Sequence, residues 1–168
     1  MTPIERIAYA ETALQEGGWY DGKQAHDPNP TMQGVTQKTY ESFGFKGSVQ
    51  FMTEDQRAMI YRAYWTAAEC DLFGPLTAPL VFDHAFNGGP GTAHKIVQRS
   101  LDLTPDGVFG PKSRAAIAAT DDRRLAYDVF VERLIAYDDL TDSAKLRIAL
   151  KAWVGRLTDY ARKYLRPT

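Results

Sequence analysis

The chain has 168 residues, of which 44% are hydrophobic and 12% aromatic, and a formal net charge of -1 from 20 basic and 21 acidic residues. This length and apolar content allow one domain or two small lobes around a substantial core. The near-neutral charge gives no indication of nucleic acid or an anionic membrane as a partner, and the basic residues of the C-terminal third are interpreted as a solvated helix face. No apolar run approaches the ~20 residues of a membrane span, so stable membrane insertion is not expected. Cys70 is single, which excludes an internal disulfide and favours a small core residue.

The first predicted helix spans residues 3–16. Thr2 fits the cap, Pro3 the first helical position and Glu5 the acid of a capping box. Its apolar face is predicted from the helical spacing of Ile4, Ile7, Ala8 and Leu14. Residues 17–34 are rich in Gly, Pro, Asp and Asn, which is typical of a functional loop or a short hairpin. A short helix is predicted over residues 38–43.

The second half of the sequence predicts helices almost throughout. A capping box at 53–56 opens a helix whose inward face is expected at Met59, Ile60, Ala63, Tyr64 and Ala67. Residues 78–86 are apolar nearly all round, which predicts a buried central helix. Further helices are expected over 92–103, after Pro111, over 122–138 and over 142–164. The predicted fold class is therefore mainly α, with a small loop or hairpin after the first helix.

Residues 16–19 read Glu-Gly-Gly-Trp, directly after the predicted first helix. The free carbonyl groups of a helix C-terminus and a neighbouring apolar ring both disfavour a negative charge, so a carboxyl group placed there tends to keep its proton. The glycines allow a sharp turn that can leave the acid facing a groove. Cleavage of a glycosidic bond requires such an acid. The simpler interpretation is that the glycines only end the helix and that Glu16 is a surface residue.

Three features follow one another in the N-terminal half: Glu-Gly-Gly-aromatic at 16–19, an acidic loop at 27–31 and Gly-Val-Thr at 34–36. In this order, and with the aromatic pair at 64–65, the half resembles the phage and bacterial N-acetylmuramidases of glycoside hydrolase family 108. The loop departs from the family's usual Asp-Pro-Gly-Gly-x-Thr, because here it reads Asp-Pro-Asn-Pro-Thr and is one residue shorter. This departure puts the position of the second carboxylate in doubt.

Three later motifs resemble the peptidoglycan-binding segment that accompanies this family. They are residues 82–89, Gln98 and Leu101 together with 106–111, and the Trp-Val-Gly-Arg-Leu run at 153–157. The resemblance implies a lysozyme-like helical fold, with a muramidase catalytic part at 1–77 and a helical peptidoglycan-binding-like part at 78–168. We expect both parts to pack as one unit, because the first offers too few helices to bury its aromatic residues alone.

The resemblance also implies an activity and its residues. It implies a lysozyme-type endolysin that cleaves the β-1,4 bond between N-acetylmuramic acid and N-acetylglucosamine with no cofactor and no metal. The implied catalytic residues are Glu16 as the general acid, Asp27 as the second carboxylate and Thr31, with Asp21 as an alternative to Asp27. Substrate contacts are expected from Trp19, Tyr20, Thr36, Asp83 and Asn87. The last two lie one helical turn apart, and a structural network is favoured for them over the groove. Trp65 is expected in the core.

The expected partners are peptidoglycan glycan strands, bound by a monomer. The N-terminus has no basic segment followed by an apolar run, so no signal peptide is expected. The protein is then made in the bacterial cytoplasm and reaches the wall in the periplasm through a lesion made by a holin-like protein, a step implied by the family alone.

Two alternatives belong to other functional classes. A non-catalytic peptidoglycan-binding module needs only the segment at 106–111, but it leaves Glu16 and its long loop unexplained. A zinc amidase or peptidase of the cell wall needs paired metal ligands. His26, His84 and His94 lack that spacing, and Cys70 has no partner.

Overall fold

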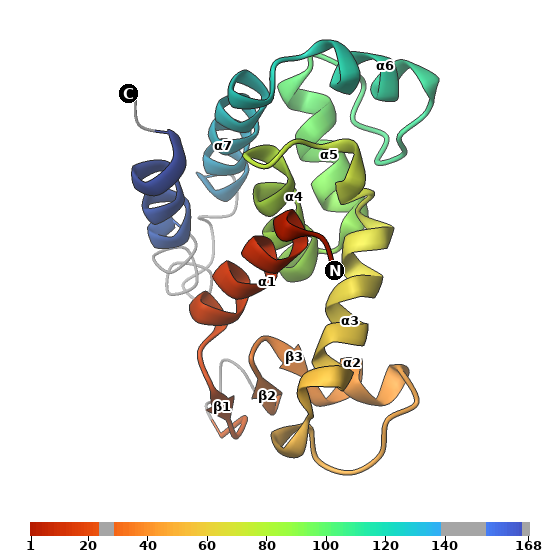
Figure 1. Ribbon diagram of the computed structural model, residues 1–168, viewed down its shortest axis with the longest axis vertical. Coiled ribbons are helices and arrows are strands. Elements are labelled where there is room, and N and C mark those ends of the chain that lie inside the picture. Colours follow the sequence, from red (N-terminus) through yellow and green to blue (C-terminus); the bar gives the residue numbers. More distant parts are fainter. Residues whose placement is uncertain (24–28, 139–153, 166–168) are drawn as a thin grey trace.

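The computed structural model describes residues 1–23, 29–138 and 154–165, and these residues form a mainly α fold with one three-stranded sheet. The predicted fold class is confirmed. Figure 1 shows the sheet and helix α2 (Gln37–Ser42) at one end of the molecule. Helices α5 (Pro90–Ser100), α6 (Pro111–Ala119) and α7 (Asp122–Asp138) lie toward the other end, with α3 (Glu54–Ala67) and α4 (Thr77–Gly88) between them. None of the described helices is long and apolar enough to cross a membrane.

Helix α1 (Pro3–Glu16) has the predicted bounds and the predicted capping box between Thr2 and Glu5. It ends because Gly17 adopts φ 71°, a left-handed conformation that favours glycine. The inward face differs from the expected one. Ala8 and Tyr9 are buried, whereas Ile7 is 42% exposed. The prediction for Ile7 was wrong because the larger Tyr9 ring takes the core-facing position.

The predicted hairpin after Glu16 is present as strands β1 (Trp19–Tyr20), β2 (Thr31–Met32) and β3 (Val35–Thr36), paired antiparallel in that order. Met32 pairs with Val35, so β2 and β3 are joined by two residues, Gln33 and Gly34. Both have positive φ, 47° and 77°. Positive φ at both central residues is the requirement of a type I′ turn, which matches the twist of the flanking strands.

Helix α2 (Gln37–Ser42) is capped by the Thr36 side chain, and a 3-10 turn, η1 (Val49–Phe51), leads to helix α3 (Glu54–Ala67). The predicted capping box of α3 is present, between Thr53 and Gln56. Ile60, Tyr61 and Trp65 form its buried face. Met59, predicted inward, is 58% exposed because the two large rings turn the opposite side of the helix to the core.

Helix α4 (Thr77–Gly88) lies in the centre of the fold and packs against α1, α3, α5 (Pro90–Ser100) and α7 (Asp122–Asp138). Its almost wholly apolar sequence suits this position, as predicted. The Phe82 ring on α4 lies 5.0 Å from Tyr9, 5.7 Å from Tyr61 and 5.8 Å from Trp65, between ring centroids. These aromatic contacts join α1, α3 and α4 into one core.

The remaining elements follow the predicted order. Helix α6 is Pro111–Ala119, α7 begins at the predicted Asp122, and α5 ends at Ser100, before the predicted end at 103. A 3-10 turn, η2 (Cys70–Leu72), places Cys70 in the core as expected. The C-terminal helix comprises residues 154–165, and its last turn, η3 (Ala161–Leu165), is π-helical. The first part of the predicted helix over 142–164, with Trp153, lies outside the described residues.

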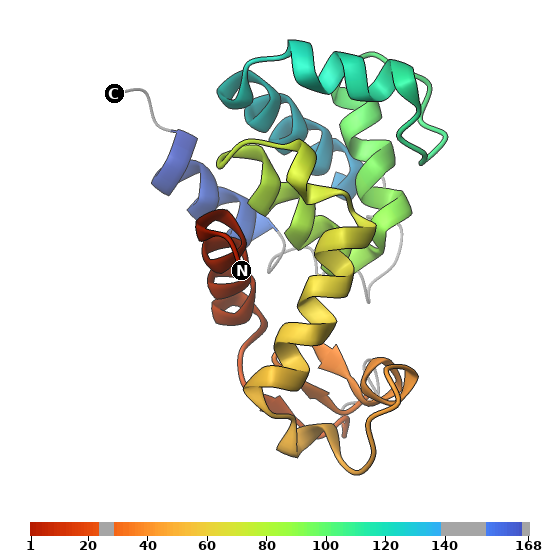
Figure 2. The same ribbon diagram turned by 45° about the vertical axis from the view of Figure 1, so that its right-hand side comes forward.

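The buried hydrophobic residues form one cluster that includes Ala8 of α1, the inward side of α4 and Leu157 of the C-terminal helix. Figure 2 shows the C-terminal helix running beside α1. Lys163 and Tyr164 on this helix both bond Glu11 on α1, with 3.0 Å between the Tyr164 hydroxyl and Glu11 Oε1. The two ends of the chain are thereby held side by side.

Candidate active site

Glu16 is the last residue of α1, and its side chain is 14% exposed. The hairpin turn presses directly against it. A Cβ atom added at Gly34 would lie 2.6 Å from Glu16 Cγ and 2.6 Å from Phe86 Cε1, closer than real contacts allow. Gly34 is therefore required both for its positive φ and for this close approach. Two motifs that are linked in the sequence only by order, at 16–19 and 34–36, meet at the carboxyl group.

Arg156 on the C-terminal helix is the direct ionic partner of Glu16. Its Nη1 donates to Glu16 Oε1 at 2.5 Å and to Asn87 Oδ1 at 3.3 Å, and it lies 3.6 Å from Asp83 Oδ1. Burial alone would lower the pKa of Arg156, but the hydrogen bond to Glu16 and the charges of Glu16 and Asp83 raise it. Arg156 thus stays charged. No local pattern predicts this contact, because the two residues are 140 positions apart, although Arg156 lies in the motif at 153–157.

Asp83 and Asn87 form the structural network that was one of their two predicted roles. Asp83 Oδ2 accepts from Arg133 Nη2 at 2.6 Å, and the Asn87 side chain donates to the Asp83 carbonyl at 2.8 Å. Arg133 is 1% exposed and also donates to the Leu80 carbonyl at 2.9 Å. Burial alone would lower the pKa of Arg133, yet Asp83 and Tyr137 raise it, so the buried guanidinium remains paired.

The loop residues are brought to the same end of the molecule. Thr31 donates to the Asn29 carbonyl at 2.9 Å, and the Thr36 hydroxyl caps α2. Asp21 is exposed and paired with Lys23 at 2.8 Å, and hydrogen bonds from Lys23 lower the pKa of Asp21. Asp27, predicted as the second carboxylate, lies outside the described residues. The structure therefore describes Asp21 and leaves the prediction for Asp27 open.

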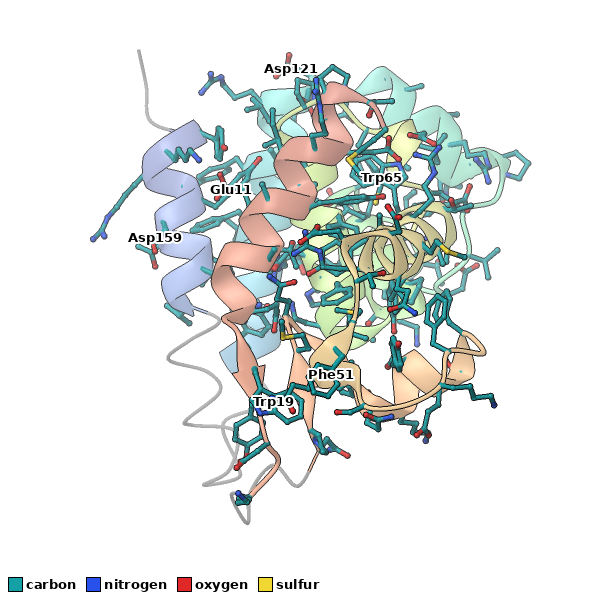
Figure 3. All side chains as sticks on the ribbon, turned by 60° about the horizontal axis from the view of Figure 1, so that its bottom comes forward. Glu11, Trp19, Phe51, Trp65, Asp121 and Asp159 are labelled. Carbon is teal, nitrogen blue, oxygen red and sulfur yellow. The ribbon has the colours of Figure 1, made fainter. Side chains whose placement is uncertain are left out.

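Two aromatic residues are exposed at this end. Trp19 on β1 is 39% exposed and Phe51 on η1 is 76% exposed, and Figure 3 shows both at the end that carries the sheet. The sequence analysis predicted a substrate contact for Trp19 and none for Phe51, whose exposure only the structure shows. Tyr20 is half-buried. Trp65, in contrast, is buried and donates to Asp71 at 2.8 Å, which confirms its predicted place in the core.

Gln98 and residues 106–111, the second of the later motifs, form a turn that side-chain hydrogen bonds hold in place. Gln98 Nε2 donates to Asp106 Oδ1 at 2.7 Å and to the Val108 carbonyl at 2.9 Å, while Gln98 Oε1 accepts from the Gly107 amide at 2.8 Å. Gly107 has φ 83°, which favours glycine. These bonds give the spacing between Gln98 and 106–111 a structural reason that needs no ligand.

The described histidines lie in the helical half and are not clustered with other metal-ligating residues. His94 Nδ1 lies 3.0 Å from the Gly107 carbonyl, and its ring stacks on Phe109 at 4.0 Å. His84 borders a cavity of about 340 Å³ between α4, α5 and α7, which Lys95 and Asn87 also line. Within the described part of the chain, no group of three or more His, Cys, Asp or Glu side chains could hold a metal ion. His26 lies outside that part.

The His84 side chain is expected to make the free energy of unfolding depend on pH. Burial lowers its pKa to about 3, and the charge of Arg133 acts in the same direction. An unfolded histidine binds its proton near pH ~6.5, so the unfolded state binds more protons between that pH and about 3. We expect this group to reduce the free energy of unfolding by ~1.4 kcal/mol per pH unit as the pH falls through this window.

Chemical denaturation of the wild type and His84→Gln at several pH values between about 7 and 4 measures this effect. The variant is expected to lose stability less steeply as the medium is acidified. Equal slopes for the two proteins would contradict the assignment.

Residues 9–89 match the family model described as glycosyl hydrolase 108. The match contains Glu16, Gly34, Asp83 and Asn87 and ends before Arg156, and it supports a glycoside hydrolase. The chain is also similar to the solved structure of Brucella abortus SagA, with a TM-score of 0.80 and 26% identity over 98% of this chain and 97% of that chain. This similarity extends through the C-terminal helix. No curated protein matches the chain.

Proposed function

We propose that this chain is a peptidoglycan hydrolase of the lysozyme type, an N-acetylmuramidase that cleaves the β-1,4 bond between N-acetylmuramic acid and N-acetylglucosamine. The observation that carries the proposal is the place of Glu16. This carboxyl group ends a helix, is largely shielded from water and is backed by a hairpin glycine, within the segment that matches the glycosyl hydrolase 108 model.

In the proposed reaction, Glu16 protonates the leaving glycosidic oxygen. Asp27 then either activates a water molecule or stabilises the oxocarbenium ion, and the separation of the two carboxyl groups decides between inversion and retention. Thr31 holds the water or a sugar hydroxyl. Among the expected substrate contacts, Trp19 is the best placed to stack on a sugar ring, because its ring is partly exposed at the sheet.

The other expected contacts have structural duties as well. The Thr36 hydroxyl caps α2, and Asp83 is held by Arg133, so neither is free to turn fully toward a ligand. We propose that Thr36, Asp83 and Asn87 shape the floor of the sugar site, with Tyr20 on β1 at its edge. The proposed partners are glycan strands, reached by a monomer in the periplasm after release by a holin-like protein.

Clearing of purified cell walls in the presence of a chelator tests this function against its alternatives. A muramidase continues to clear the walls, a zinc amidase or peptidase stops, and a binding module never clears them. Loss of clearing on addition of the chelator would contradict the proposal.

Matched substitutions show which of the two candidates, Asp27 or Asp21, is the second carboxylate. Asp27→Asn is expected to reduce the rate of wall hydrolysis by ~10²-fold or more, as loss of an acid or base commonly does, and Asp21→Asn by less than about tenfold. Asp21 is exposed and already satisfied by Lys23. Initial rates of turbidity loss at one wall concentration measure both. The reverse order would assign the role to Asp21.

A further inference from the structure

Arg156 contacts the proposed general acid, and it comes from the other end of the chain. The side chains of Arg156 and Glu16 are only 12% and 14% exposed, and Nη1 lies 2.5 Å from Oε1. Solvent screens such a pair less than it screens a surface salt bridge, so the attraction between the two charges is stronger. Glu16 lies within the segment that matches the family model, and Arg156 lies outside it.

The helix that carries Arg156 is fixed in place on both sides. The Tyr160 hydroxyl donates to the Leu76 carbonyl at the start of α4, and Leu157 is buried in the common core. On the other side, Lys163 pairs with Glu11 of α1. Glu11 and Glu16 belong to the same helix, so the C-terminal helix is attached to α1 at two points. Figures 1 and 2 show the two helices next to each other from two directions.

Arg156 is also held by groups on α4. Arg133 binds Asp83 Oδ2, which leaves Asp83 Oδ1 facing Arg156 at 3.6 Å, and Asn87 Oδ1 accepts from Arg156 at 3.3 Å. Two guanidinium groups and two carboxylates thus alternate from the buried Arg133 to Glu16. An arginine with this many fixed acceptors has a defined orientation and can define that of its partner.

We propose that Arg156 is a positioning residue for Glu16. It occupies Oε1 and leaves Oε2 as the oxygen that carries the proton to the glycosidic bond. The inference rests on the proposed catalytic role of Glu16. It makes the C-terminal helix a part of the active site rather than of a separate wall-binding module.

The other charged or titratable groups described around Glu16 have little effect on its pairing with Arg156. Asp83 on α4 lies beyond Arg156 and is held by Arg133. On α3, burial raises the pKa of Tyr61, so its hydroxyl stays neutral, and Arg57 is paired with Glu54. Among the described residues, Arg156 is the cation in direct contact with Glu16.

The separate kcat and KM values of wall hydrolysis test the proposal, because a misplaced acid slows the chemical step without weakening substrate binding. Arg156→Gln is expected to lower kcat by about tenfold or more and to leave KM near its wild-type value. Arg156→Lys keeps the charge and not the planar fork, so it is expected to lower kcat by a smaller factor. The matched control is Arg162→Gln, on the same helix but exposed and paired with Asp159, which should change neither. A folded Arg156→Gln protein that keeps the wild-type kcat, or that changes KM alone, would overturn the proposal.

A second measurement does not depend on the folding of the Arg156 variants or on activity. Wild type and Glu16→Gln, both with ¹⁵N-labelled arginine, are compared by NMR. The Arg156 guanidinium signals are expected to shift and to exchange faster with solvent in Glu16→Gln, while those of the buried Arg133 stay in place. Unchanged Arg156 signals would overturn the proposed pairing even if the enzyme is active. A shift in a protein without hydrolase activity would support the pairing and contradict the proposed function alone.

Discussion

Glu16→Gln is expected to leave the protein folded and to reduce peptidoglycan hydrolysis by ~10²–10⁴-fold, the usual loss on removal of a general acid. Glutamine keeps the shape of the side chain, so its close packing against Gly34 is retained. It cannot donate the proton that the leaving glycosidic oxygen needs. Circular dichroism and thermal unfolding check the fold, and release of new reducing ends from purified walls measures the rate.

Glu11→Gln is the matched control for this substitution. It makes the same chemical change on the same helix, and it also removes an ion pair with the C-terminal helix. Glu11 does not contact Glu16, and Leu157 and Tyr160 still hold the C-terminal helix in this variant. The rate of hydrolysis is therefore expected to change by less than about threefold, as for a surface ion pair. Near-normal activity in a folded Glu16→Gln protein, or equal losses in both variants, would contradict the assignment of the acid.

Removal of the C-terminal part is expected to have the other large effect. A chain that ends at Pro75 lacks α4, whose Phe82 ring contacts Tyr9, Tyr61 and Trp65. These three aromatic residues would then face water, and the two remaining long helices could not bury them. We expect this chain to be insoluble or molten, and inactive.

The full chain is expected to unfold in one cooperative transition, because one buried cluster includes residues from both halves. Calorimetry of the full chain measures this directly, and the ratio of calorimetric to van't Hoff enthalpy is expected to be near one. Two resolved transitions, or a folded and active protein that ends at Pro75, would show that the halves are independent domains.

Helix ends were predictable from the sequence because a cap is built from neighbouring residues. The capping boxes after Thr2 and Thr53 are both present, and α7 begins at the predicted residue. Helix faces were less predictable. Ile7 and Met59 fit a helical spacing but are exposed, since the rings on the same helices decide which side is buried.

The candidate site was predictable in part. Glu16 and the glycine at 34 belong to motifs that the sequence places in order, and the structure brings them into contact. Arg156 could not be placed in the same way. It belongs to the motif at 153–157, but its partner lies 140 residues away and the motif gave no reason to pair the two. Such a contact depends on how the C-terminal helix docks against α1, which no local pattern records.

The identity of the new chain ends tests the central claim most directly. Purified peptidoglycan is digested, reduced with borohydride and analysed by mass spectrometry. A muramidase leaves N-acetylmuramic acid at the new reducing end, so the account predicts products that end in the reduced form of that sugar. Products that end in reduced N-acetylglucosamine, or solubilised wall with no new reducing end, would contradict it.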